Sequence, residues 1–326
     1  MYIVTLNGKT KNMNKLYLIK NPDLFQGEKN LTKNKEYFEG WYFKNTNKEN
    51  GISFIPGINI EKNKPKAFVQ VITNDTSHFV NYNIDEFKFN HEPFIIKIGN
   101  NVFSKEGIHI DIKTEDLHIN GDIKYTNNKS INTDFMNPNI MGPFSYVPFM
   151  ECNHAILSMQ NNTNGSIKIN DYEMKFDNDM GYIEKDWGIS FPKTYIWCQG
   201  NNFKRSNASF MLSIADVPFK MFKFRGVICV LVINDKEYKF TTYNNSRLIE
   251  YDINDNSLNI TLKKGDLNIN LKSTFDKGQK LSAPVKGKMD KNIFERIDST
   301  ITVTLKQGDN IIFSDTSTNC GLEIVK

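Results

Sequence analysis

Apolar and polar residues alternate along most of the chain from about residue 38 onward. The clearest segments are residues 108–112, 258–262 and 301–305, in which every second residue is Ile, Leu or Val. Each segment leads through a polar turn with Gly or Asp into a second apolar segment. A period of two places alternate side chains on opposite faces of a strand, so the pattern predicts antiparallel hairpins with one buried and one solvated face.

A sustained helical period is hard to find, and its best candidate, residues 289–297, is short. Many strands without intervening helices are typical of β-sandwiches and β-barrels. The sequence therefore predicts an all-β protein.

Two domains are expected, because 326 residues are more than one ordinary domain contains. A faint internal repeat supports this division. When Trp41 is set against Trp197, the Ser, Phe and Ile residues at positions 53, 54 and 58 fall on the same residue types at 209, 210 and 214.

The seam is expected near residues 185–193, where Gly188 and Pro192 interrupt the strand pattern. The predicted division is an N-terminal β domain, residues 1–188, and a C-terminal lipocalin-like β-barrel domain, residues 189–326. The first 36 residues form an irregular segment of the first domain.

The charge and hydropathy of the chain bear on whether it binds nucleic acid or a membrane. The 41 basic and 37 acidic side chains give a net charge of +4 with both signs mixed, which does not favour nucleic-acid binding. The longest apolar run, residues 227–233, suits a buried strand and is too short for a membrane span. The start of the chain lacks signal-peptide features and the four cysteines form no CxxC pair, so we expect a cytoplasmic protein with reduced thiols and at most peripheral membrane contact.

Motifs for cofactors are missing from the sequence. Among the five histidines, His109 and His118 stand at polar positions of neighbouring predicted strands, where solvation is the simplest expectation. No phosphate-binding loop or dinucleotide fingerprint occurs. We therefore predict neither a metal ion nor a cofactor.

Four unusual strings carry a family resemblance. They are YFEGWYFK at residues 37–44, MGPFSYVPFMECNH at 141–154, GYIEKDWG at 181–188 followed by Phe191-Pro192, and NCGLEIV at 319–325. In this order they resemble the tocopherol cyclase family over about residues 22–325.

The resemblance implies a two-domain, lipocalin (calycin)-like β fold. It also implies a cofactor-independent cyclisation, in which a prenylated hydroquinone or similar polyene closes to a chromanol-type ring. An acid protonates the side-chain alkene, and the phenol oxygen captures the resulting cation. Related folds carry other reactions, so the fold alone fixes no chemistry.

Glu39 is the first candidate for this acid. A carboxyl group stays protonated at neutral pH when it is buried among apolar groups, and aromatic faces stabilise a cation. On an extended strand Glu39 shares a face with Tyr37, Trp41 and Phe43. The alternative is a structural carboxylate.

Glu184 and Asp186 are the second candidates. In an extended segment both project to one face, and two neighbouring negative charges raise the pKa of one of them. The alternative is a network of ion pairs that includes Lys185. Glu151 and His154 follow an aromatic segment, residues 144–149, that could form the wall of a pocket or a loop packed on the core.

We expect the three catalytic candidates Glu39, Glu184 and Asp186 to converge on one cavity between the domains. The expected substrate-binding residues are Trp41, Tyr42, Tyr146, Glu151, His154, Trp187 and Trp197.

The expected partner is an apolar, prenylquinol-like small molecule. A carrier of such a molecule is the alternative function, since lipocalin-type barrels hold apolar ligands without chemistry. The distinguishing feature is a buried carboxyl group without a cationic partner, which a carrier has no need of.

Overall fold

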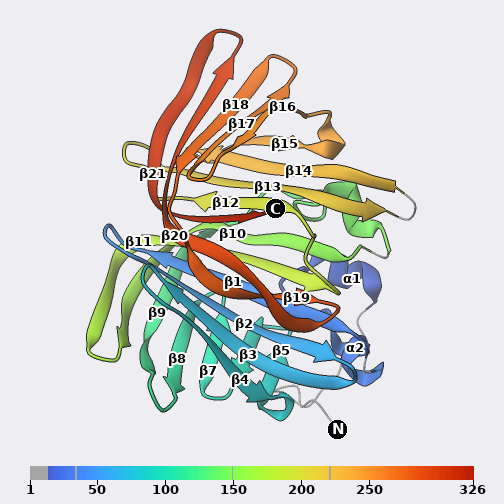
Figure 1. The fold of residues 1–326 in the computed structure, drawn as a ribbon, viewed down its shortest axis with the longest axis vertical. Helices are drawn as coiled ribbons and strands as arrows, with labels where there is room; N and C mark the ends of the chain where they lie inside the picture. The colour runs from blue at the N-terminus through green and yellow to red at the C-terminus, as the bar shows by residue number, and fades with distance from the viewer. Residues whose placement is uncertain (1–13, 34, 149, 220–221) are drawn as a thin grey trace. The chain divides into compact units, whose positions relative to one another are not determined.

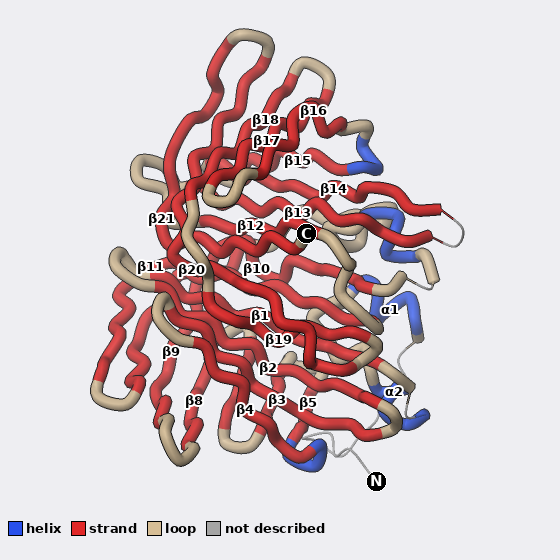
Figure 2. The backbone as a smooth tube through the Cα atoms, viewed as in Figure 1, coloured by secondary structure: helices blue, strands red, loops and turns tan. Residues whose placement is uncertain are grey.

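The computed structural model describes residues 14–33, 35–148, 150–219 and 222–326. Strands make up most of this part of the chain, as Figure 2 shows in red. The short α-helices are α1 (Lys15–Lys20) and α2 (Glu28–Lys33), and the 3-10 helices are η1 (Ile84–Glu86), η2 (Gly142–Tyr146) and η3 (Thr242–Asn244). The prediction of an all-β fold is confirmed.

The first antiparallel sheet has the strand order β4-β3-β2-β1-β11-β10-β9-β8-β7-β6-β5. Its strands are β1 (Tyr37–Thr46), β2 (Gly51–Glu61), β3 (Lys64–Thr73), β4 (Ser77–Asn83), β5 (Phe87–Asn90), β6 (Ile95–Ile98), β7 (Asn101–Ser104), β8 (Gly107–Lys113), β9 (His118–Lys129), β10 (Cys152–Ile169) and β11 (Tyr172–Gly188).

The second antiparallel sheet has the order β15-β14-β13-β12-β21-β20-β18-β17-β16, with β19 paired to β20. Its strands are β12 (Tyr195–Gly200), β13 (Ala208–Phe219), β14 (Phe222–Ile233), β15 (Lys236–Thr241), β16 (Arg247–Ile253), β17 (Ser257–Lys264), β18 (Leu267–Thr274), β19 (Gln279–Val285), β20 (Lys288–Gln307) and β21 (Asn310–Val325).

Each sheet encloses its own hydrophobic core. In the first, one cluster joins residues from strands far apart in the sheet order, such as Ile52 on β2, Phe103 on β7 and Ile183 on β11. In the second, Ile196, Leu262 and Val303 belong to one cluster in the same way. Because distant strands share one core, each sheet must curve around it, as in a barrel-like calycin fold (Figure 1).

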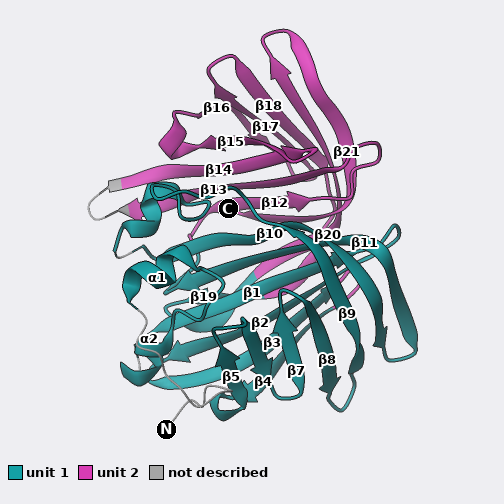
Figure 3. Ribbon diagram, turned by 180° about the vertical axis from the view of Figure 1, so that it is seen from behind, with its two compact units in different colours: residues 1–72, 77–191, 282–292 teal, residues 73–76, 192–281, 293–326 magenta. Residues whose placement is uncertain are grey.

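The chain divides into two compact units, coloured in Figure 3. Unit 1 contains residues 1–72, 77–191 and 282–292, and unit 2 contains 73–76, 192–281 and 293–326. The change at residues 191–192 lies within residues 185–193, where the seam was expected, and three residues after the predicted division between 188 and 189.

Residues 282–292, the hairpin end of β19 and β20, belong to unit 1 although they come late in the chain. Gln70 exchanges hydrogen bonds of 3.0 Å with the backbone of Ser282, and the Asn59 amide donates to the Gly287 carbonyl at 3.0 Å. The candidate helix at 289–297 is wrong, because this segment lies within the long strand β20.

The two sheets share one strand plan. Across the first sheet, the four neighbouring strands β4 to β1 are followed by the hairpin β11-β10. Across the second, the four neighbouring strands β15 to β12 are followed by the hairpin β21-β20. Phe54 and Phe210 both lie in a core, as the sequence repeat suggests, but Trp41 lies in the core of unit 1 whereas Trp197 is absent from that of unit 2.

No α-helix in the described residues is long and apolar enough to cross a membrane.

Candidate acid–base site

Strand β11 presents two different groups of ionisable side chains on its two faces. Lys185 pairs with Trp41 of β1, and Trp41 is a core residue, so Lys185 faces the core of unit 1. Glu184 and Asp186, one residue to either side, face the opposite side of the sheet. The sequence prediction that these two carboxyl groups share a face is met.

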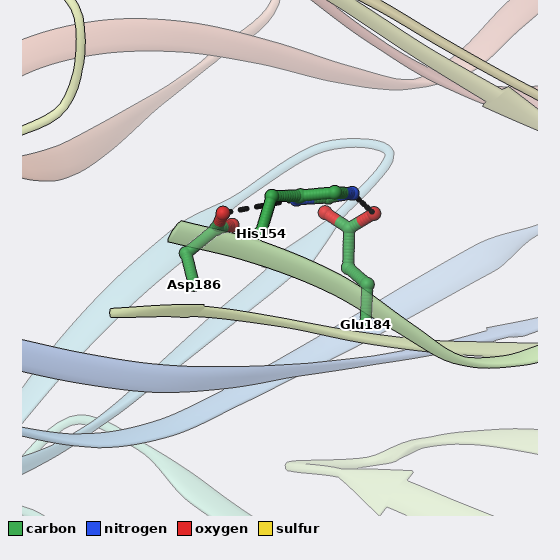
Figure 4. Close-up of side chains that lie close together, drawn as sticks. All are labelled: His154, Glu184 and Asp186. Atoms are coloured by element: carbon green, nitrogen blue, oxygen red, sulfur yellow. Dashed lines mark hydrogen bonds and ion pairs between the residues drawn. The ribbon is translucent and has the colours of Figure 1, made fainter. Parts of the chain in front are cut away.

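His154 on β10 completes the group, because it pairs directly with Asp186 in the sheet. Its Nδ1 lies 2.9 Å from Oδ1 of Asp186, and its Nε2 lies 3.6 Å from Oε2 of Glu184. Figure 4 shows the imidazole ring between the two carboxyl groups, with one at each ring nitrogen.

The three side chains are largely withdrawn from water. Glu184 is 5% exposed, His154 13% and Asp186 23%, so Asp186 is the most accessible member. Burial lowers the pKa of His154, but the negative charges of Asp186 and Glu184 outweigh it and raise this pKa to about 9. His154 is therefore an imidazolium at neutral pH.

Tyr182 supports the deep end of the group. Its hydroxyl donates a 2.6 Å hydrogen bond to Oε2 of Glu184, the oxygen that also faces His154. Burial first, and then the charge of Glu184, raise the pKa of Tyr182 well above its usual value, so it stays a neutral donor. Sequence reasoning missed Tyr182, although its spacing of two residues from Glu184 on a strand already places both on one face.

Two sulfur groups adjoin the shallow end. The thiol of Cys152 lies 3.9 Å from Oδ1 of Asp186, and burial raises its pKa well above the usual value, so it is not a thiolate nucleophile. The backbone N–H of His154 donates to the sulfur of Met141 at 3.1 Å. Met141 precedes η2, so the MGPFSY string lies against the site.

The same three residues could be considered as metal ligands, since His154, Glu184 and Asp186 offer ligand atoms within 4.8 Å of one another. However, the two carboxyl groups face different ring nitrogens. Three protein ligands are as many as a catalytic zinc site uses, but a metal ion would occupy one ring nitrogen and leave the other carboxyl group facing the second nitrogen. The geometry suits a shared proton better than a metal ion.

Glu39 does not join Glu184 and Asp186. It faces the core side of the sheet, 2.5 Å from the ammonium nitrogen of Lys185, and both are fully buried. Tyr37 and the backbone N–H of Gln26 also donate to its carboxylate. The expected convergence of three carboxyl groups is wrong, because Glu39 and the other two occupy opposite faces of one sheet.

The predicted substrate-binding residues are dispersed. Tyr42 pairs with Glu184 in the sheet and is buried on the same face, where its hydroxyl accepts a hydrogen bond from Ser53. Trp41 is a core residue whose indole N–H donates to the Asp23 carbonyl, and Trp187 packs on the same core.

The remaining candidates are Tyr146, Glu151 and Trp197. Tyr146 is half-buried, and its hydroxyl donates to the carbonyl of Phe135. Glu151 is exposed. Trp197 is buried on β12 of unit 2.

A family model described as tocopherol cyclase-like matches residues 125–325, more than half of the chain. The match includes all four members of the group, His154, Tyr182, Glu184 and Asp186. The chain belongs to the tocopherol cyclase-like family, as its sequence strings predicted.

Solved structures show the same fold at low identity. Kievitone hydratase from Nectria haematococca is 13% identical with a TM-score of 0.51, each chain being covered to 89%. A protein of Nitrosomonas europaea assigned as AttH is 10% identical over 98% of both chains with a TM-score of 0.53. CghA with Sch210972 is 7% identical over 89% of this chain and 88% of the other, with a TM-score of 0.55. No curated protein sequence matches the chain.

Proposed function

We propose that this protein is a cofactor-independent acid–base cyclase of an apolar, prenylated phenol or similar polyene, with His154 as the proton donor. The observation that carries the proposal is the position of the imidazole between the buried Glu184 and the half-buried Asp186, which raises the pKa of His154 to about 9. The feature expected from the sequence to separate a cyclase from a carrier, a buried carboxyl group without a cationic partner, is not found at Glu39, Glu184 or Asp186, because Lys185 pairs with Glu39 and His154 faces the other two. The proposal rests instead on the imidazolium as the proton donor, a group that a carrier of an apolar molecule has no need of.

The roles of the three residues follow from their contacts. Asp186 holds Nδ1 at 2.9 Å and fixes the orientation of the ring. Nε2 is buried and has no hydrogen-bond partner in the described part of the chain, so a substrate that reaches it meets an N–H without a competing acceptor. Glu184, 3.6 Å away, stabilises the imidazolium and takes back a proton when the phenol oxygen closes the ring.

The strength of this acid limits the substrate. An imidazolium with a pKa near 9 is a weaker acid than the neutral carboxylic acid expected from the sequence. It therefore requires an electron-rich alkene whose protonation gives a tertiary cation, and the trisubstituted alkene of a prenyl side chain meets this requirement.

Glu39 has no part in the proposed chemistry. Its carboxylate is held by Lys185, Tyr37 and Gln26, so an acidic proton on it would have to displace these partners. Its role is structural, which was the alternative left open by the sequence.

The test is turnover of a geranyl-substituted hydroquinone and its quinone in D₂O, with the product separated by chromatography and its mass measured. Acid-catalysed closure places one deuterium on carbon, where the alkene was protonated. A closure without proton transfer to carbon gives a product of the same mass as in water after exchange of its hydroxyl protons.

The variant His154→Gln should lose roughly 10²- to 10⁴-fold in turnover while it still binds the molecule. His109→Gln is the matched control, since the exposed His109 makes a similar contact of 2.8 Å with Asp122. Equal loss in both variants, or full turnover in His154→Gln, would exclude His154 as the donor. Binding without turnover in the unaltered protein would favour the carrier.

A further inference from the structure

A second group of polar side chains lies inside unit 1, on the core face of the sheet and therefore opposite His154. Asn45, Gly181 and Asn161 stand side by side on β1, β11 and β10, because Gly181 pairs with both asparagines. Tyr125 of β9 pairs with Thr163 of β10, two residues beyond Asn161.

The direction of these side chains follows from their neighbours. Asn45 is two residues from the core residue Phe43, and Tyr125 stacks on Phe43 with ring centroids 6.4 Å apart. A Cβ on Gly181 would lie 2.1 Å from Oδ1 of Asn161 and 2.8 Å from Cγ2 of Thr163. Both side chains thus lean over the glycine on the core face.

Gly181 begins the GYIEKDWG string, and its close contacts explain why that position has no side chain. Any Cβ there would displace the Asn161 amide. Residues of the GYIEKDWG string therefore contribute to both faces of the sheet. Glu184 and Asp186 lie on one face, and Gly181 leaves room for the Asn161 side chain on the other.

These side chains are buried, and most of their polar atoms lack a hydrogen bond; the Nδ2 of Asn161 donates a long one, 3.4 Å, to the Ser158 hydroxyl. Asn45, Asn161 and Thr163 are fully buried, and Tyr125 is 4% exposed. In the described part of the chain, both amide atoms of Asn45, Oδ1 of Asn161 and the hydroxyls of Thr163 and Tyr125 have no hydrogen bond. Burial raises the pKa of Tyr125 and the nearby Asn45 offsets a part of this, but the two do not reach hydrogen-bond geometry.

Five such atoms in one place are unusual, because buried polar groups are nearly always paired. All four side chains are uncharged, and together they offer both donors and acceptors. The aromatic rings of Phe43 and Phe103, 5.5 Å apart, adjoin them.

We propose that this polar group, Asn45, Tyr125, Asn161 and Thr163, is a second binding site, for a neutral and largely apolar molecule that carries a hydroxyl or carbonyl group. The polar end bonds to the amides and hydroxyls, and the apolar body packs against the aromatic rings. An ion is disfavoured, since no member of the group carries a charge to compensate it. This site lies beyond the proposed acid–base function and does not depend on it.

The test uses three probes of one shape: 1-naphthol, naphthalene and 1-naphthoate, measured by equilibrium dialysis against the full chain. The expected order of affinity has 1-naphthol about tenfold or more above the other two, which corresponds to one or two hydrogen bonds. Asn45→Leu and the milder Tyr125→Phe should each reduce the preference for 1-naphthol over naphthalene to about threefold or less.

Asn101→Leu is the matched control. Asn101 is also a fully buried asparagine of unit 1, but its amide donates to Tyr82 and Ile98 and accepts from the Asp111 N–H. Its loss should leave the preference for 1-naphthol unchanged. Equal binding of the three probes, no binding of any, or a preference that survives both Asn45→Leu and Tyr125→Phe would overturn the proposal.

Discussion

Three consecutive residues of β11 take part in two buried ionic groups that differ in completeness. On the core face, the ammonium group of Lys185 bonds to Glu39 at 2.5 Å and to the carbonyls of Pro22 and Leu24 at 2.8 and 2.6 Å. All three of its hydrogens have acceptors. On the other face, His154 faces Glu184 and Asp186, but its Nε2 has no hydrogen-bond partner in the described residues.

The difference separates a structural role from a chemical one. Lys185 is fully buried, and its contacts tie the segment between α1 and α2 to the sheet. Trp41 and Trp187, with ring centroids 4.7 and 4.9 Å from its nitrogen, stabilise the charge further. On the other face, the imidazolium of His154 has a pKa of about 9 and an Nε2 without a hydrogen-bond partner in the described residues, so this group has a proton to donate.

Lys185→Met should have the largest effect on the free energy of unfolding. Burial lowers the pKa of Lys185, and the negative charge of Glu39 counters this, so the buried ammonium group depends on the carboxylate beside it. Removal of the lysine leaves a buried carboxylate and two carbonyls without their donor, at a cost of about 3–5 kcal/mol. Urea unfolding followed by tryptophan fluorescence measures this loss.

Lys105→Met is the control for that measurement. Lys105 contacts Asp23 at 2.6 Å, but its side chain is 37% exposed. The expected loss is about 1 kcal/mol or less. A similar loss in both variants would mean that the Lys185 network contributes no more than a surface pair.

The next effect is a dependence of stability on pH that comes from His154. Its pKa is about 9 in the folded protein and 6.5 in the unfolded chain. A raised pKa stabilises the folded state fully below pH 6.5, and this contribution disappears as the pH rises through 9. The difference of 2.5 units corresponds to about 3 kcal/mol at most.

Urea unfolding at pH 6 and pH 9.5 tests this dependence by comparison with His154→Gln. The variant should lose most of the fall in stability between these two pH values, while His109→Gln should retain it. An unchanged pH dependence in His154→Gln would contradict the raised pKa.

The fold could be predicted from the sequence because a period of two specifies strands directly. The period of two also placed Glu184 with Asp186 on one face of their strand and Glu39 with Trp41 on one face of theirs, as observed. The sequence could not predict whether these two pairs lie on the same side of the sheet, because a shift of one residue in the pairing of the strands exchanges the two faces. Tyr42 pairs with Glu184, so Glu39 lies on the other face.

The internal repeat failed at Trp41 and Trp197 for the same reason. Phe54 pairs with Phe43 and Phe210 with Gly200, so matching these pairs sets Trp197 against Gly40 and not against Trp41. Gly40 pairs with Asp186 and Trp197 pairs with Glu323, so Glu323 of unit 2 corresponds to Asp186 of unit 1. Asp186 pairs in turn with His154 and Glu323 with Glu295, so Glu295 corresponds to His154. Unit 2 thus has carboxyl groups at both positions where unit 1 has the histidine–carboxylate pair, a relation that only the register reveals.

The smallest expected effect on stability comes from two tyrosines, one on each face of the sheet, whose hydroxyls each donate a hydrogen bond to a carboxylate. Tyr37 donates to Glu39 at 2.7 Å and Tyr182 donates to Glu184 at 2.6 Å, in both cases from two residues earlier on the strand. Tyr37→Phe and Tyr182→Phe each leave a buried carboxylate with one donor fewer, so each should reduce the free energy of unfolding by about 1–3 kcal/mol.

Only Tyr182→Phe should also change the titration of His154. Without the Tyr182 hydroxyl, the charge on Glu184 acts more fully on the imidazolium, so the apparent pKa of His154 should rise. The pH at which stability begins to fall would then move upward in Tyr182→Phe and stay in place in Tyr37→Phe. NMR titration of the His154 ring protons measures the same shift directly. If the two variants move it equally, the two faces of β11 are electrostatically coupled, and the separation of a structural pair from a chemical pair does not hold.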